Sequence, residues 1–72
     1  MKEYIVLYYT KSSARGDDPF GMRFWADDPD HAEEQLLDAE PDGEAVWVFL
    51  GNDYRAAIHE YWSQAQGNHF ER

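Results

Sequence analysis

The sequence has no cysteine, so it can form neither a disulfide nor a zinc site with thiolate ligands, and this favours a reducing compartment. Its 72 residues are enough for one domain only. A domain of this size buries only about 60% of the surface that its unfolded chain exposes. Aromatic residues make up 17% of the chain and compensate for the small size, because each such side chain can bury ~150–250 Å².

Long apolar runs are missing as well. The N-terminal stretch "MKEYIVLYYTK" is too short to span a membrane and lacks a small-residue cleavage site, so it predicts a strand and not a signal peptide. We therefore expect a cytoplasmic protein with no membrane association.

Recognisable catalytic motifs are also absent. The chain has no glycine-rich phosphate loop and no nucleophile elbow, and His31, His59 and His69 lack the spacing of zinc ligands. The stretch "DAEPDGE" (38–44) resembles the start of a calcium loop, but position twelve of such a loop is Phe49, where a bidentate Glu is required. The sequence predicts no enzyme, no metal and no cofactor.

Three apolar segments predict strands, and the whole chain reads as β-β-α-β-α. The strands are expected at Glu3–Thr10, Phe20–Ala26 and Glu44–Gly51. The first and third strands are apolar on both faces. In the second, Arg23 indicates that one face is partly exposed to solvent, which is typical of an edge strand. A right-handed crossover makes the third strand parallel to the second. We therefore predict an α+β domain whose three-stranded, mostly antiparallel sheet has the order 2-1-3.

The first helix is predicted from Asp28, as N-cap, to about Glu40. Pro29 occupies the first helical position, and the "PDG" that follows Glu40 stops the helix and turns the chain. The apolar stripe is expected to consist of Ala32, Leu36 and Ala39, widened by Leu37.

The second helix shows the cleanest amphipathic pattern. Asn52 or Asp53 is expected to cap it, Gly67 to end it, and residues 68–72 to form a tail that can fray. Its apolar residues are Tyr54, Ala57, Ile58, Tyr61, Trp62 and Ala65. If both helices lie on one face of the sheet, the other face exposes aromatic side chains and predicts a dimer. Otherwise the second helix covers that face.

Positive charge is missing from one quarter of the chain. The net charge is −9, and residues 27–44 carry nine acids and no Lys or Arg, while the remainder has six acids and six bases. A protein that binds nucleic acid directly needs a basic footprint, which this sequence lacks. The nine acids are the candidate partner-binding residues: Asp27, Asp28, Asp30, Glu33, Glu34, Asp38, Glu40, Asp42 and Glu44.

The acidic pattern is unfavourable for the helix itself. Asp30, Glu34 and Asp38 repeat at i, i+4 and i+8, and like charges at this spacing cost a few tenths of a kcal/mol per pair. From Asp28 to Glu40 there is roughly one acid per 3 Å of helix axis, close to the ~3.4 Å between phosphates of one DNA strand. We therefore predict that the helix occupies a Lys/Arg-lined groove of a nucleic-acid-binding partner.

The segment "FWADDPDHAEEQLLDAEPDGEAVWV" has a strand–helix–turn–strand form that resembles small phage proteins. In size, acidity and aromatic content the chain is similar to anti-CRISPR inhibitors, several of which imitate nucleic acid or block its channel. The resemblance implies an inhibitor acting in a host cytoplasm, with a CRISPR effector as a candidate partner. A second hypothesis is a homodimeric structural or regulatory domain that associates through its aromatic sheet face, with the acids serving solubility alone.

Overall fold

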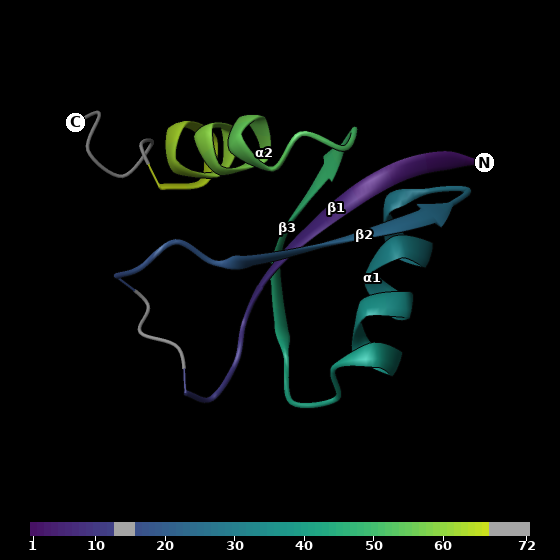
Figure 1. The fold of residues 1–72 in the computed structure, drawn as a ribbon, viewed down its shortest axis with the longest axis horizontal. Helices are drawn as coiled ribbons and strands as arrows, with labels where there is room; N and C mark the ends of the chain where they lie inside the picture. Colours follow the sequence, from purple (N-terminus) through teal and green to yellow (C-terminus); the bar gives the residue numbers. More distant parts are fainter. Residues whose placement is uncertain (13–15, 67–72) are drawn as a thin grey trace.

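The structure, a computed structural model, describes residues 1–12 and 16–66. Its elements follow the predicted β-β-α-β-α order, with a π-helical segment, η1, after the second helix (Figure 1). They are β1 (Lys2–Tyr9), β2 (Phe20–Ala26), α1 (Pro29–Ala39), β3 (Glu44–Leu50), α2 (Tyr54–Glu60) and η1 (Tyr61–Gln66). The expected stop at Gly67 and the tail at 68–72 lie outside the described residues.

The sheet has the order β2-β1-β3, as predicted, with β1 antiparallel to both neighbours. The β1–β2 register is continuous over seven residue pairs, whereas the β1–β3 register shifts between Leu7 and Tyr8. β1 starts and ends one residue before the predicted bounds. β3 ends at Leu50 because Gly51, with φ 135°, leaves the strand conformation, and its N–H donates to the Glu3 carbonyl at 2.8 Å.

α1 begins and ends where its capping residues predict. The Asp28 carboxylate accepts the His31 N–H at 2.8 Å, and the Glu40 N–H donates to the Leu36 carbonyl at 2.7 Å. The Gly43 N–H then donates to the Glu40 carbonyl at 2.8 Å and closes the turn into β3.

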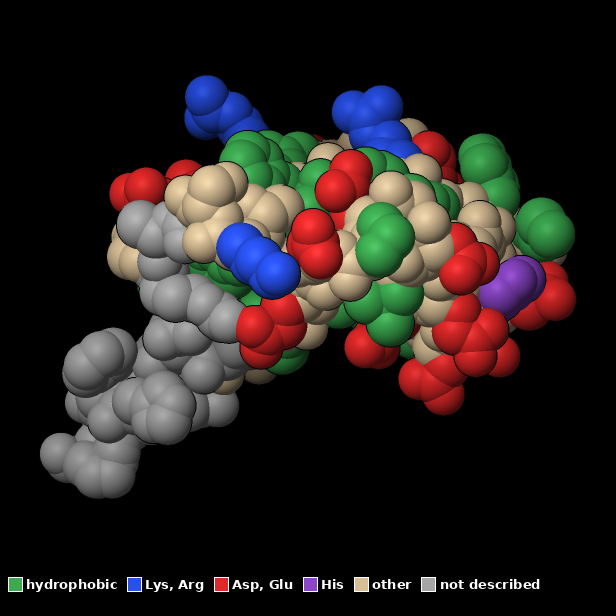
Figure 2. All heavy atoms as spheres, turned by 90° about the horizontal axis from the view of Figure 1, so that it is seen from below, with side chains coloured by type: hydrophobic (Ala, Val, Ile, Leu, Met, Phe, Trp, Pro, Cys, Tyr) green, Lys and Arg blue, Asp and Glu red, His purple; other side chains and the backbone are tan. Residues whose placement is uncertain are grey.

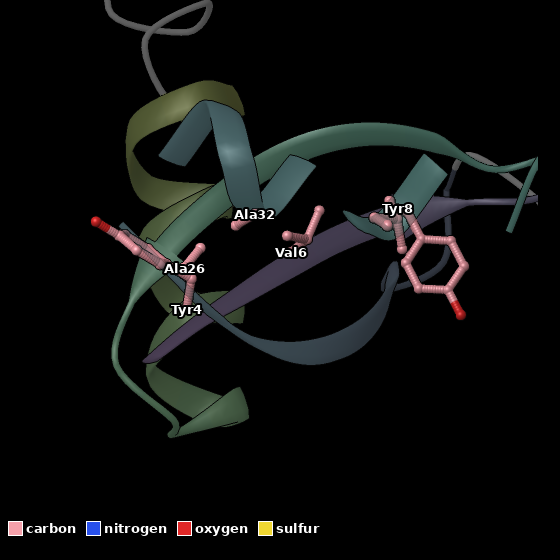
Figure 3. Close-up of a cluster of buried hydrophobic side chains, with 6 residues drawn as sticks. Tyr4, Val6, Tyr8, Ala26 and Ala32 are labelled. Carbon is pink, nitrogen blue, oxygen red and sulfur yellow. The ribbon is translucent and has the colours of Figure 1, made fainter. Parts of the chain in front are cut away.

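The apolar stripe of α1 is narrower than predicted. Ala32 and Leu36 are fully buried in a cluster with Tyr4, Val6, Tyr8 and Ala26 (Figure 3). The assignment of Leu37 and Ala39 to the stripe was wrong, because Leu37 is 42% exposed and Ala39 is exposed in the last turn. Leu37 follows Leu36 by about 100° around the helix, which turns it away from the sheet.

α2 covers the opposite face of the sheet. Asp53, and not Asn52, is its N-cap, and Ala57 and Tyr61 pack against Ile5 and Leu7 of β1. This settles the placement that the sequence left open: the aromatic face is covered from within the chain (Figure 1).

The expectation that the second helix continues as an α-helix up to Gly67 was wrong beyond Glu60. The π-helical winding begins at Tyr61, whose ring meets that of Trp62 edge to face at 5.0 Å. Both rings belong to the cluster beneath the helix. A wider turn accommodates two adjacent bulky rings on the sheet side. No helix of the described residues is long and apolar enough to cross a membrane.

Candidate functional site: the acidic surface

Eight of the nine predicted partner-binding acids lie on α1 and on the turns at its two ends, and Glu44 is the first residue of β3. We call the nine together the acidic surface. Glu33 and Glu40 are half-buried and the other seven are exposed. Figure 2 shows acidic side chains gathered at the α1 end of the molecule, with Lys and Arg elsewhere on this view. The fold thus places the predicted set along α1 and at its two ends.

The solvent side of α1 is a row of three carboxylates. Glu34 lies two residues from each of the buried Ala32 and Leu36, so it is about 200° from both around the helix and faces away from the sheet. Asp30 and Asp38 are one turn before and after it and are exposed. Because Ala32 and Leu36 pack in the core on the opposite side of the helix, this row points toward solvent.

Some members of the acidic surface have roles within the fold. Asp28 caps α1, and Asp42 approaches Lys11 at 3.9 Å with both side chains largely exposed, an ion pair that contributes little. Glu40 closes the helix through its backbone. Burial, and secondarily the charge of Glu40, raises the pKa of the Tyr8 phenol above 10.0. The Asp28 carboxylate therefore serves the start of the helix, whereas Glu40 acts at its end through the backbone alone.

Glu44 also has a partner within the chain, which leaves five acids without any such role: Asp27, Asp30, Glu33, Glu34 and Asp38. No basic nitrogen of the described residues lies within 4.0 Å of their carboxylates. The exposed Leu37 sits among them on α1. Their charges are thus available to an outside partner.

Sequence reasoning missed how the residues before β2 are tied to the second helix. The Trp62 indole N–H donates to the Asp18 carboxylate at 2.9 Å, and the Tyr54 hydroxyl donates to the Pro19 carbonyl at 2.5 Å. Burial, and secondarily the charge of Asp18, raises the pKa of the Tyr54 phenol. No local pattern signals contacts between residues 35 to 44 positions apart.

The edge of the sheet at β2 was also missed as a surface. Phe20 and Trp25 are 52% and 58% exposed there. A hollow of about 570 Å³ runs along the strand, lined by Phe20–Arg23, Ile5 and Tyr54. The alternation of β2 predicted an edge, but not the exposure of its aromatic residues.

The described residues contain no group of three or more acidic or His side chains placed to hold a metal ion. The calcium-loop resemblance at 38–44 corresponds to the last turn of α1 and the turn into β3.

Comparison of the chain with protein-family models, curated proteins and solved structures finds no match. No relative therefore adds a residue role to the acidic surface.

Proposed function

We propose that the protein is a small acidic inhibitor that binds a nucleic-acid-binding partner through the acidic surface. The supporting observation is the row Asp30–Glu34–Asp38, which faces solvent without a basic neighbour among the described residues. No hydrogen bond or ion pair among the described residues uses these carboxylates, and repulsion between like charges one turn apart opposes the helix, offset in part by the first-turn position of Asp30. A Lys/Arg-lined groove would use them.

The geometry of α1 sharpens the comparison with a DNA strand. The helix is about 16 Å long, and the solvent-facing row carries one charge per turn, about 6 Å apart. That spacing corresponds to roughly every second phosphate of one strand. Glu33 and Asp27 add charges beside the row. The surface would attract a basic groove at long range and increase the association rate.

The resemblance to anti-CRISPR inhibitors suggests a partner of the CRISPR-effector kind and a site of action in the host cytoplasm. No catalytic step is part of the proposal. The second hypothesis, a dimer through the aromatic sheet face, has less support because α2 and η1 cover that face.

Displacement of a labelled DNA duplex from a purified effector complex, followed by fluorescence anisotropy, tests the proposal. Wild-type protein should displace the duplex, and displacement should weaken as salt rises. Replacing four acids by amides should abolish it: Glu33→Gln, Glu34→Gln, Asp38→Asn and Glu40→Gln.

A matched pair of double variants separates position from net charge. Glu34→Gln with Asp38→Asn should weaken displacement, whereas Glu3→Gln with Asp17→Asn, which removes the same charge away from α1, should leave it nearly unchanged. Salt-insensitive displacement, or equal effects of the two pairs, would contradict the proposal.

A further inference from the structure

Helices cover both faces of the sheet, so the parts of the sheet itself that remain accessible are its two edges. β2 is an edge strand whose seven pairs with β1 contain no bulge. The β3 edge is interrupted, because its register shifts between Leu7 and Tyr8. A regular edge presents unpaired N–H and C=O groups that another strand can bond, and bulges are a common protection against this. β2 lacks that protection.

The side chains of β2 suit an apolar partner. Arg23 is its one charged residue, and no described acid lies within ion-pair distance of it. Phe20 and Trp25 are more than half exposed. The Gln35 side chain donates to the Trp25 carbonyl at 2.8 Å and occupies that end of the strand, which leaves the backbone from Phe20 to Phe24 for pairing.

We propose that β2 pairs antiparallel with β2 of a second copy about a two-fold axis, which joins two three-stranded sheets into one of six strands. A second copy fits because the one charge within β2 is Arg23 and the nearest acids, Asp18 and Asp27, lie outside the strand, so two chains of net charge −9 meet at a strand without acids. In any such pairing the odd-numbered residues of the two strands face each other. Trp25 then lies across from Gly21, Arg23 or Trp25 of the other copy. The first of these registers also sets Arg23 across from Arg23 and is disfavoured, whereas a guanidinium or a second ring is a favourable neighbour for the indole.

The size of the surface predicts a weak dimer. The half-exposed rings of Phe20, Trp25 and Tyr54 offer roughly 100 Å² each, so the total buried area falls near or below the ~1,200 Å² of the smallest stable complexes. The two β1 strands would lie three strand spacings apart, about 14 Å, with α1 of each copy on the same side. Added salt screens repulsion between the two acidic helices, so it should strengthen the dimer.

Sedimentation equilibrium from micromolar to millimolar protein tests the proposal. The average mass should rise from 8.5 kDa toward twice that value, and more so at high salt. Trp25→Lys should weaken association at least about tenfold. Leu50→Lys is the matched control, because Leu50 is 59% exposed on the other edge strand and the charge change is the same. It should leave association unchanged.

Amide chemical shifts recorded on dilution should change along β2 and not along β3. Circular dichroism checks that Trp25→Lys folds, and Phe20→Lys is the alternative variant at the same edge. A wild-type protein that stays monomeric at millimolar concentration overturns the proposal, as does equal weakening by Leu50→Lys. Salt separates this association, which it strengthens, from inhibitor binding through the acidic surface, which it weakens.

Discussion

The two sides of the sheet use their acidic residues in different ways. On the α2 side, carboxylates accept hydrogen bonds from distant groups: Glu60 from the Trp47 indole at 2.9 Å and Asp18 from the Trp62 indole at 2.9 Å. On the α1 side, the acids at the helix ends have local roles, and the row Asp30–Glu34–Asp38 has none among the described residues. Hydrogen bonds thus distinguish the carboxylates that hold the fold together from those that have no partner among the described residues.

The two helices are also attached to the sheet in different ways. α1 is held mainly by apolar contact through Ala32 and Leu36, with one hydrogen bond from Gln35 to the sheet. α2 and η1 combine apolar packing with side-chain hydrogen bonds that fix Tyr54 and Trp62. Because α1 needs so few residues for packing, most of its surface is available for charge.

The largest effect should come from Leu36→Ala, which removes the main anchor of α1. We expect the free energy of unfolding to fall by about 2–5 kcal/mol, the usual range for a buried Leu in a closed core. Leu37→Ala, next to it but 42% exposed, should change stability by less than about 0.5 kcal/mol. Urea unfolding followed by circular dichroism measures both. Similar losses in the two variants would show that α1 does not rest on the Ala32–Leu36 stripe.

On the other side of the sheet, Gly21→Ala should disturb the attachment of α2. A Cβ at this position would lie 2.6 Å from the Cδ1 atom of the Tyr54 ring, so the ring has to move and its hydrogen bond to Pro19 is strained. We expect a loss of about 1–3 kcal/mol in urea unfolding. The same substitution in a Tyr54→Ala background should cost much less, because only the 3.2 Å approach to the Ile5 Cγ2 atom remains. A full loss in that background would place the cause outside the Tyr54 contact.

Within the acidic surface, Asp28→Ala should be the costliest single change, because it removes the cap of α1. The expected loss is about 1 kcal/mol. Asp27→Ala removes the same charge one residue earlier, where no hydrogen bond depends on the side chain, and should be nearly neutral. Thermal unfolding of the two variants measures the difference. Equal effects would mean that charge, and not capping, stabilises the helix start.

Local signals in the sequence were sufficient for most of the fold. The Asp28-Pro29 start and the Pro41 stop bound α1 correctly, and the two-sided apolar pattern of β1 placed it in the centre of the sheet. These features depend on neighbours in the chain. Helical periodicity wrongly assigned Leu37 and Ala39 to the buried stripe of α1. The width of the stripe that the sheet can bury depends on the packing geometry of its three strands, which periodicity does not contain.

The candidate site was predictable only in part. That eight of the nine acids lie along one helix and its turns follows from the bounds of α1, with Glu44 at the start of β3. That the fold leaves five of them with neither a local role nor a basic neighbour among the described residues depends on where Lys11, Arg23 and Arg55 come to lie. The exposure of Phe20 and Trp25 depends equally on tertiary structure, which no short-range pattern encodes.

The smallest expected effect on stability comes from neutralising a single carboxylate. It should also be the most informative, because the sign of the change is expected to differ between the two sides of the sheet. Glu34→Gln relieves repulsion with Asp30 and Asp38, so we expect stability to rise by a few tenths of a kcal/mol, with Gln as good a helix former as Glu. Glu60→Gln removes the same charge but weakens the bond from Trp47, so stability should fall by about 0.5–1 kcal/mol. The gain at Glu34 should vanish in high salt, whereas the loss at Glu60 should persist, since its partner is half-buried. Urea unfolding at low and high ionic strength measures both. A loss of stability in Glu34→Gln would mean that the fold does use the acidic row, and would remove the main reason to assign it to a partner.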